Sequence, residues 1–110
     1  MKLTIHGSKR MGQRHGKKGR KARELANRAF LKGKPRESLT GALRKWVDNK
    51  FFEHNQTGLH FVYGGFHYVF SDERKLITTY KIPERVLSRD KNKELKKVIK
   101  NGRLSEAFLF

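Results

Sequence analysis

His6, Arg10 and Arg14 are the first residues of this sequence whose types and spacing suggest chemistry. They stand four residues apart, so they share one face if the segment is helical from His6 onward. Histidine titrates near neutral pH and can transfer protons, and arginine binds phosphate oxygens through paired N–H groups. The shared face is therefore a candidate site for chemistry on a phosphate-containing substrate. The alternatives are that His6 caps the helix and that the two arginines form a solvated basic face.

Metal-independent cleavage of RNA needs the residue types in which this chain is rich. A base takes the proton of the 2′-hydroxyl group, cations stabilise the charge of the pentacoordinate phosphorane, and an acid protonates the leaving 5′-oxygen. The chain has five His, three Tyr and 27 Lys and Arg residues. This composition permits a ribonuclease without requiring one.

Several other kinds of site are excluded or disfavoured. The chain has no Cys, which excludes a disulfide scaffold, a thiolate zinc site and cysteine catalysis. It has no HExxH, Gly-x-Ser-x-Gly or Walker motif. His60 and His67 approach each other if the segment around them is a hairpin, but without nearby carboxylates they are a weak zinc signal. We therefore expect no metal and no cofactor.

The positive charge of the chain points to a polyanionic partner. The formal net charge is +17, with +12 on residues 1–48, +1 on residues 49–90 and +4 on residues 91–110. RNA is the first partner to consider, because basic residues release the counterions condensed on a polyanion. A membrane is disfavoured because the most basic stretch, residues 17–28, has few apolar residues and no Trp, and we expect a cytoplasmic protein. DNA ranks third because no helix-turn-helix spacing is evident. The expected phosphate contacts, or merely solubilising charges, are Lys9, Lys17, Lys18, Arg20, Lys21, Arg23, Arg28 and Lys81.

The elements that must position these residues follow from hydrophobic periodicity. Ser8 can cap a first helical turn that runs to Arg14. Apolar residues at helical spacing predict amphipathic helices over residues 17–32 and 38–49, separated by Gly33 and Pro35, and we expect both to cover one apolar face of a sheet. We expect Trp46 in the core.

A β-meander over residues 59–81 is predicted by the change to a period of two, with Gly64-Gly65 as a two-residue turn. This turn places His60, Val62, His67 and Val69 on one face, where we expect His67 to be exposed and available for proton transfer. The other face is aromatic, and it is either core or a platform on which single-stranded RNA stacks. With a second loop over residues 71–75, Leu76, Thr78 and Tyr80 join the aromatic face, and Ile77, Thr79 and Lys81 join the histidine face.

Residues 5–14, 61–70 and 76–80 together resemble the plan of the barnase/EndoU/colicin/RelE superfamily of small toxin-type and phage-borne ribonucleases. The segments that carry the resemblance are Ile-His-Gly-Ser-Lys-Arg-Met-Gly-Gln-Arg, Phe-Val-Tyr-Gly-Gly-Phe-His-Tyr-Val-Phe and Leu-Ile-Thr-Thr-Tyr. The resemblance covers about residues 3–83. It implies N-terminal helices on an antiparallel sheet, with His and Arg supplied by the first helix and a Thr by the last strand. It nominates His6, Arg10 and Arg14, and Thr79 with its neighbours Thr78 and Tyr80.

We therefore expect an α+β fold, with N-terminal helices packed on a three- to four-stranded antiparallel sheet and a short C-terminal helix. Residues 1–83 would form one RelE/barnase-like domain, and residues 84–110 a basic extension whose helix ends near residue 101. The expected function is RNA binding with metal-independent endoribonuclease activity of toxin or mobile-element type. In that reaction His6 or His67 transfers the proton, Arg10 and Arg14 hold the phosphate, and Thr79 or Tyr80 orients it.

The alternative is a non-catalytic protein that binds RNA through its basic ends, such as a phage-type inhibitor of a CRISPR effector or its guide RNA, or a ribosome-associated protein. Besides RNA, the expected partners are an acidic antitoxin or a host RNA–protein complex. The oligomeric state is left open.

Overall fold

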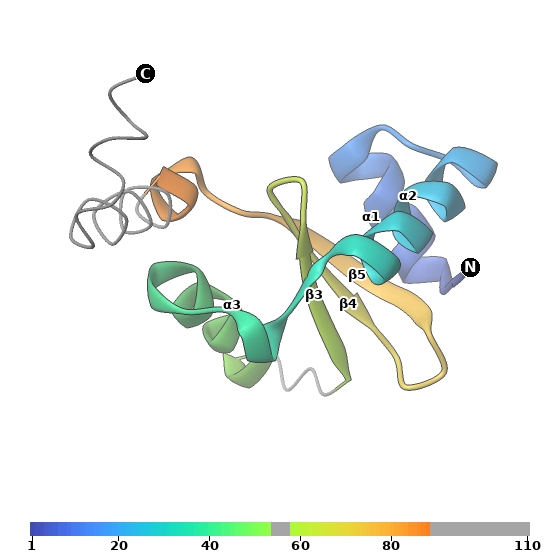
Figure 1. The fold of residues 1–110 in the computed structure, drawn as a ribbon. Coiled ribbons are helices and arrows are strands. Elements are labelled where there is room, and N and C mark those ends of the chain that lie inside the picture. The colour runs from blue at the N-terminus through green and yellow to red at the C-terminus, as the bar shows by residue number, and fades with distance from the viewer. Residues whose placement is uncertain (54–57, 89–110) are drawn as a thin grey trace, which may run out of the picture.

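The computed structural model describes residues 1–53 and 58–88 and has an α+β architecture in three layers (Figure 1). Five strands form one mixed sheet in the order β1-β5-β4-β3-β2. The helices are α1 (Ile5–His15), α2 (Gly19–Lys32) and α3 (Gly41–Glu53), with a 3-10 turn η1 (Arg36–Ser38) before α3; the strands are β1 (Lys2–Leu3), β2 (Lys34–Pro35), β3 (Leu59–Tyr63), β4 (Phe66–Phe70) and β5 (Lys75–Lys81). Residues 84–88 are also helical.

The two short strands correct the predicted sheet. β1 pairs with β5 in parallel, Lys2 opposite Lys75, so the sheet is mixed and not purely antiparallel. β2 adds an antiparallel edge beside β3, in the segment predicted as a simple turn between helices. A strand of two residues is too short to show a period of two, so the sequence predicted only the longer strands.

α1 is fixed at its start by Thr4, not by the predicted cap Ser8. The Thr4 Oγ1 atom accepts a hydrogen bond from the Gly7 N–H group at 2.9 Å and donates one to the Leu76 carbonyl oxygen at 3.1 Å. A Cβ atom on Gly7 would lie 2.2 Å from that same carbonyl oxygen, so only glycine allows this close approach. Thr4 and Gly7 therefore seat α1 directly on β5.

The predicted hairpin between β3 and β4 is confirmed. Tyr63 lies opposite Phe66 and Val62 opposite His67, as the two-residue turn requires. Gly64 and Gly65 have φ values of 57° and 80°, which a type I′ turn demands of both central residues. His60 and His67 consequently lie on the same face, with Nδ1 of His60 2.8 Å from Nε2 of His67.

The predicted register of β5 is wrong by one residue over most of the strand. Leu76 lies opposite Phe70, but a bulge follows, and Thr78 lies opposite Val69, Thr79 opposite Tyr68 and Tyr80 opposite His67. The loop before β5 turns at Arg74, whose φ is 65°, a conformation that no glycine in the sequence announces. The bulge places Thr79 on the aromatic face and Tyr80 on the histidine face, the reverse of the expectation.

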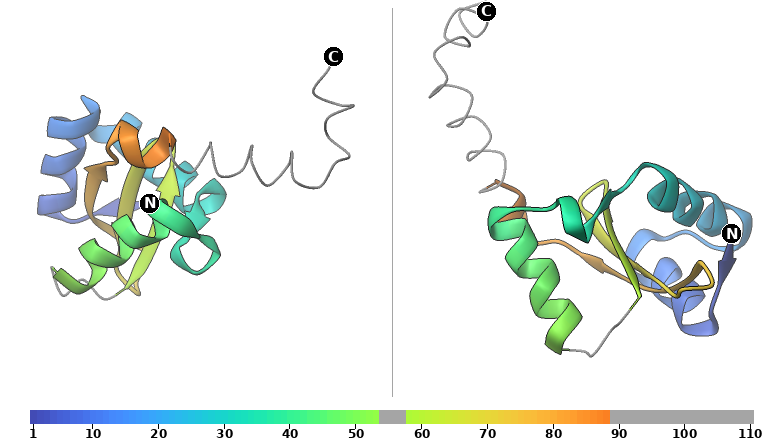
Figure 2. Two further views of the ribbon diagram at one scale, coloured as in Figure 1. Left: turned by 90° about the vertical axis from the view of Figure 1, so that its left-hand side faces the viewer. Right: turned by 60° about the horizontal axis from the view of Figure 1, so that its bottom comes forward.

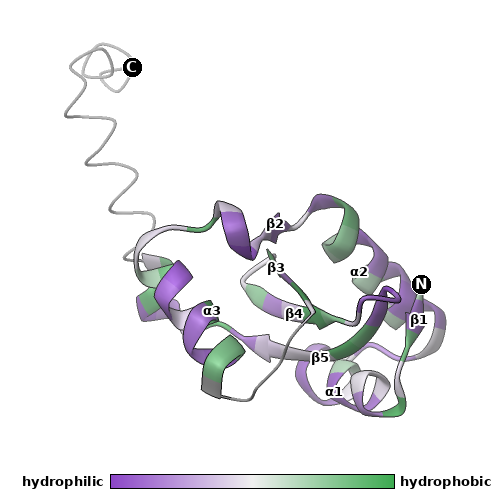
Figure 3. Ribbon diagram, turned by 90° about the horizontal axis from the view of Figure 1, so that it is seen from below, coloured by the Kyte–Doolittle hydropathy of each residue, from purple (hydrophilic) through white to green (hydrophobic). Residues whose placement is uncertain are grey.

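The helices cover opposite faces of the sheet, whereas the sequence predicted that the two amphipathic helices would share one (Figure 2). α1 and α2 pack on the aromatic face, where Met11, Tyr68 and Phe70 are buried together with the small residues Ala22, Ala26 and Ala29. α3 packs on the histidine face through Leu43 and Val47, which form a second cluster with Val62, Ile82 and Val86. The aromatic face is thus core and not an open stacking platform. In Figure 3, β5 is green over its first part and pale lilac toward its C-terminal end, and hydrophilic residues are prominent on α2 and α3.

The predicted C-terminal helix begins within the described part, because residues 84–88 are helical and Val86 is buried against α3. Its expected continuation to residue 101 lies outside the described residues. No helix in residues 1–53 or 58–88 is long and apolar enough to cross a bilayer.

Candidate nucleic-acid interface

The helix face predicted from His6, Arg10 and Arg14 is present in the structure. Nε of Arg10 donates a hydrogen bond to Nε2 of His6 at 3.3 Å, and Nη1 of Arg10 donates one to Oε1 of Gln13 at 3.0 Å. His6 is exposed and Arg10 is half-buried. The hydrogen bond from Arg10 leaves the Nε2 lone pair of His6 occupied, so His6 acts as a base at this nitrogen only when the bond opens.

Arg14 connects this helix face to the end of β5. Its guanidinium group donates a hydrogen bond to the Thr79 carbonyl oxygen, and its central carbon lies 5.0 Å from the centroid of the Tyr80 ring. Burial and, after it, the neighbouring Arg10 charge lower the pKa of Arg14, with Tyr80 acting in the opposite direction. Two arginine charges are therefore held close together on one surface, and this is the arrangement that a phosphate group would stabilise.

The groove next to Arg14 is lined by residues from three elements. α1 supplies Gln13 and Arg14, α3 supplies Trp46 and Lys50, and β5 supplies Tyr80 and Lys81, around a volume of about 450 Å³. We call it the Tyr80 groove. Nζ of Lys50 lies 5.1 Å from the centroid of the Tyr80 ring and 5.5 Å from that of Trp46. The Tyr80 ring thus lies near cationic groups of two helices, Arg14 of α1 and Lys50 of α3, and Lys50 also lies near Trp46.

The sequence nominated Arg14, Tyr80 and Lys81 but missed Gln13, Trp46 and Lys50 as lining residues. Trp46 was expected in the core; it is half-buried and contributes both to the cluster under α3 and to the groove. The available signal was the spacing of Trp46 and Lys50, four residues apart on a predicted helix. What the sequence could not supply was the position of that helix beside the end of β5.

Thr79 is positioned as a supporting residue and not as a substrate contact. Its side chain is fully buried on the aromatic face, with Oγ1 3.0 Å from Nε2 of His15. The His15 ring packs on Phe66 and Tyr68, with centroid distances of 4.0 and 5.5 Å. Burial, followed by repulsion from Arg14 and Lys17, lowers the pKa of His15 to about 4. The expected role of Thr79 at the phosphate is therefore corrected; the bulge in β5 turns it inward.

His67 is buried, which corrects the expectation that it is exposed. α3 covers its face of the sheet, and the centroid of its ring lies 5.6 Å from those of Trp46 and Tyr80. Burial, then the neighbouring His60 and Lys50, lower the pKa of His67 to about 3. Its Nδ1 atom has no hydrogen-bond partner among the described residues. His67 therefore supports the two rings of the Tyr80 groove from beneath and cannot touch a ligand in it.

Among the described residues, no third ligand joins His60 and His67, the pair that gave the weak zinc signal. Within residues 1–53 and 58–88, no group of three or more His, Asp or Glu side chains is arranged to hold a metal ion. The nearest pair, His60 and His67, faces aromatic rings, including Phe51 at 5.0 Å from His60.

The basic residues predicted to contact phosphates are all exposed. Lys81 lines the Tyr80 groove, whereas Lys9 and Lys18 line a separate hollow beside α1. Arg20 is paired with Glu24 at 2.9 Å, within α2. The remaining predicted contacts, exposed on α2 or on the segment before it, are Lys17, Lys21, Arg23 and Arg28.

Comparison with known proteins identified no relative of this chain. No family model, no curated protein and no solved structure matches the chain.

Proposed function

We propose that the Tyr80 groove and the adjoining His6–Arg10 face of α1 bind single-stranded RNA and cleave it without a metal ion. The observation that carries the proposal is the position of Arg14, which belongs to the predicted helix face and also stacks on the Tyr80 ring at 5.0 Å. Arg14 thereby joins the helix face that carries His6 and Arg10 to an aromatic ring. Phosphate and base would be recognised side by side.

The groove suits one nucleotide of a single strand. Trp46 and Tyr80 offer ring surfaces, and base–aromatic stacking contributes about 1–3 kcal/mol per base. Arg14, Lys50 and Lys81 place three cations around these rings, all from the groove lining. Stacking tolerates any base, so the strand would be bound with little sequence selectivity.

Cleavage would proceed by attack of the ribose 2′-oxygen on the adjacent phosphorus. His6, released from its hydrogen bond with Arg10, takes the 2′-hydroxyl proton, and the P–O5′ bond breaks as the new P–O2′ bond forms. Arg10 and Arg14 stabilise the added negative charge of the phosphorane. The leaving 5′-oxygen takes a proton from water. The products are a 2′,3′-cyclic phosphate and a 5′-hydroxyl end.

The test is incubation of RNA with the protein in EDTA, followed by analysis of the fragment ends. We expect 2′,3′-cyclic phosphate ends with the natural chain and a loss of cleavage in a His6→Ala, Arg10→Ala double variant. Arg85→Ala is the matched control, because Arg85 is exposed on the helical segment 84–88, outside the groove lining. Equal cleavage by the double variant and the natural chain would remove this assignment.

A second candidate function is RNA binding without cleavage. The burial of most described histidines favours it. His15 is half-buried and His60 and His67 are buried, so His6 is the only exposed one among the described histidines. An RNA-binding inhibitor or ribosome-associated protein would need the cations and rings but no second imidazole. In the same assay it would leave the RNA intact and retard it in a native gel.

A further inference from the structure

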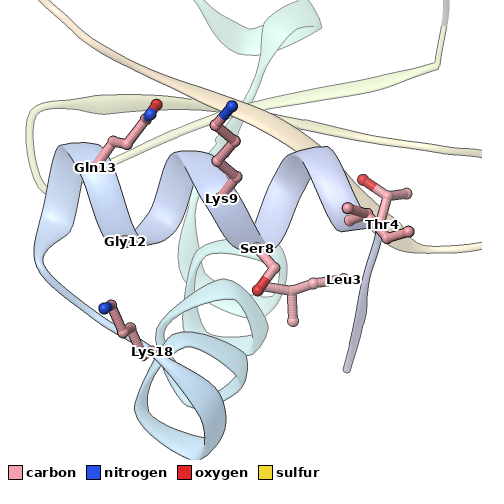
Figure 4. Close-up of a pocket in the computed structure, with 8 residues that line it drawn as sticks. Leu3, Thr4, Ser8, Lys9, Gly12, Gln13 and Lys18 are labelled. Carbon is pink, nitrogen blue, oxygen red and sulfur yellow. The ribbon is translucent and has the colours of Figure 1, made fainter.

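A second concave surface lies beside α1, and its lining differs from that of the Tyr80 groove. The larger part, about 760 Å³, is lined by Ile5 and runs along α1 past Ser8 and Gly12, which Figure 4 labels. The smaller part, about 500 Å³, shares Ile5 and Ser8 and extends to Ala22 at the start of α2. We call the two together the Ile5 hollow. The two parts adjoin each other, because Leu3, Thr4, Ile5 and Ser8 line both.

The apolar side chains that line the Ile5 hollow are aliphatic and include Leu3, Ile5 and Ala22, whereas Thr4, Ser8 and Gln13 are polar. Ile5 is 93% exposed although it is the first residue of α1, and Leu3 lies half-buried next to it. Gly12 supplies no side chain, and a Cβ atom placed there would meet only Lys18, at 3.7 Å or more. Neither part has an aromatic residue in its lining. An aliphatic side chain would bury apolar surface here, whereas a nucleic-acid base would find no ring on which to stack.

The rim of the hollow is cationic. Lys9 and Lys18 lie on opposite sides of Gly12 (Figure 4), and Lys2 and Arg23 border the smaller part. No Asp or Glu lines either part, and none of these four cations forms a salt bridge with the described residues. Lys75 also lines the smaller part but already faces Glu73 at 3.4 Å. The rim therefore complements carboxylate groups.

We propose that the Ile5 hollow is the docking site for an acidic segment of a partner protein. The segment inserts an aliphatic side chain beside Gly12 and sets carboxylates against Lys9 and Lys18. The aliphatic lining is what distinguishes this occupant from RNA, since both would be attracted by the rim. The inference does not rest on the function proposed for the Tyr80 groove.

The test measures binding of three fluorescent peptides of equal length to the full chain. The first contains Glu residues around two Leu residues, the second contains Glu alone, and the third keeps the two Leu residues with Gln in place of Glu. Burial of a Leu side chain predicts that the first peptide binds roughly tenfold more tightly than the all-Glu peptide. The Gln peptide is expected to lose binding because it lacks the carboxylates.

Two variants locate the binding. Gly12→Leu places a bulky side chain in the hollow and is expected to weaken binding of the Glu–Leu peptide roughly tenfold, whereas Gly12→Ala adds one methyl group at ordinary contact distance from Lys18 and leaves binding nearly unchanged. Both substitutions favour a helix over glycine, so a loss seen only with Leu reflects occupied space and not unfolding. Ile5→Lys should also weaken binding, with Leu31→Lys as the control, because Leu31 is 69% exposed and lies outside both parts.

Three results would overturn the docking proposal. Equal affinity for the Glu–Leu and all-Glu peptides would mean that charge alone attracts them. Loss of single-stranded RNA binding in Gly12→Leu but not in Gly12→Ala would assign the hollow to RNA. A change in sedimentation of Gly12→Leu relative to the natural chain would make the occupant a second copy of this protein.

Discussion

The two faces of the sheet bury different chemistry under their helices. On the aromatic face, the rings of Tyr68 and Phe70 pack against Met11 and small alanines, and the pair His15–Thr79 is the polar contact among them. On the histidine face, α3 covers His60 and His67, and His67 lies beneath Trp46 and Tyr80. The first face contributes mainly apolar burial. The second places His67 directly under the candidate site. Each face holds one histidine of lowered pKa, His15 on the first and His67 on the second, so stability depends on pH through both.

The largest effect is expected from removing a ring on the aromatic face. Phe70 is fully buried and contacts Phe30 and Phe61 at centroid distances of 5.2 and 5.7 Å. Phe70→Ala should lower the free energy of unfolding by about 3–5 kcal/mol, measured by urea denaturation. A loss below about 1 kcal/mol would show that α2 does not pack on this face as described.

A pH effect of about half that size should come from the histidine face. His67 is neutral in the folded protein, because its pKa is lowered to about 3, and it takes up a proton on unfolding below its ordinary pKa of 6.5. Stability is thus fully present above pH 6.5 and is lost as the pH falls toward 3. For His67 the loss between pH 7 and pH 5 is about 2 kcal/mol. His15, with a pKa of about 4, acts in the same direction.

The control for this pH effect separates the two faces. His67→Gln should remove about half of the difference in unfolding free energy between pH 7 and pH 5, because His15 contributes a similar part, whereas Phe70→Ala should lower stability at both pH values and keep the difference. A His67→Gln variant with the full pH dependence would assign the effect to another group.

A smaller effect is expected on RNA binding when Arg14 is removed. Arg14→Ala should weaken binding of a single-stranded RNA about tenfold, and Arg85→Ala should not. Binding that neutralises about six phosphates predicts a slope near −4 in a plot of log affinity against log salt, and loss of one contact should reduce its magnitude by about 0.7. A flat salt response in the natural chain would contradict any polyanion partner.

The smallest expected effect is a gain in stability from a substitution in α1, which covers the aromatic face. Gly12→Ala in α1 should raise the free energy of unfolding by up to about 1 kcal/mol, because alanine has the higher helix propensity and its Cβ atom has room. Thermal unfolding at neutral pH would measure it. Destabilisation by this substitution would mean that Lys18 cannot move aside and that the hollow is tighter than its lining indicates.

Local sequence patterns were sufficient to predict the helices and the hairpin between β3 and β4. The periodicity of α2, the shared face of His6, Arg10 and Arg14, and the register set by Gly64-Gly65 depend on residues close in sequence. The register of β5 depends on Arg74 at positive φ and on a bulge near Ile77, and neither has a glycine to mark it. That single shift explains why Thr79 and Tyr80 were assigned to the wrong faces.

The candidate site was predictable only in part, for the same reason. α1 could be read from its own sequence, but Trp46 and Lys50 join Arg14 only because α3 crosses to the opposite face of the sheet. The short strand β2 and the turn η1 make that crossing, in a segment that looked like a tight helix–helix connection. Long-range placement of this kind has no signature in a local window.

The parallel pairing of β1 with β5 also determines when, during synthesis, α1 can take its final position. Lys2 and Leu3 cannot find Lys75 and Leu76 until nearly all of the described chain has been synthesised. Thr4, which seats α1, depends on the same late strand through the Leu76 carbonyl oxygen. Contacts of such long sequence separation slow folding. In a nascent chain α1 therefore stays without its contacts to β5 until β5 has been synthesised, and Arg14 reaches Thr79 and Tyr80 only after that point.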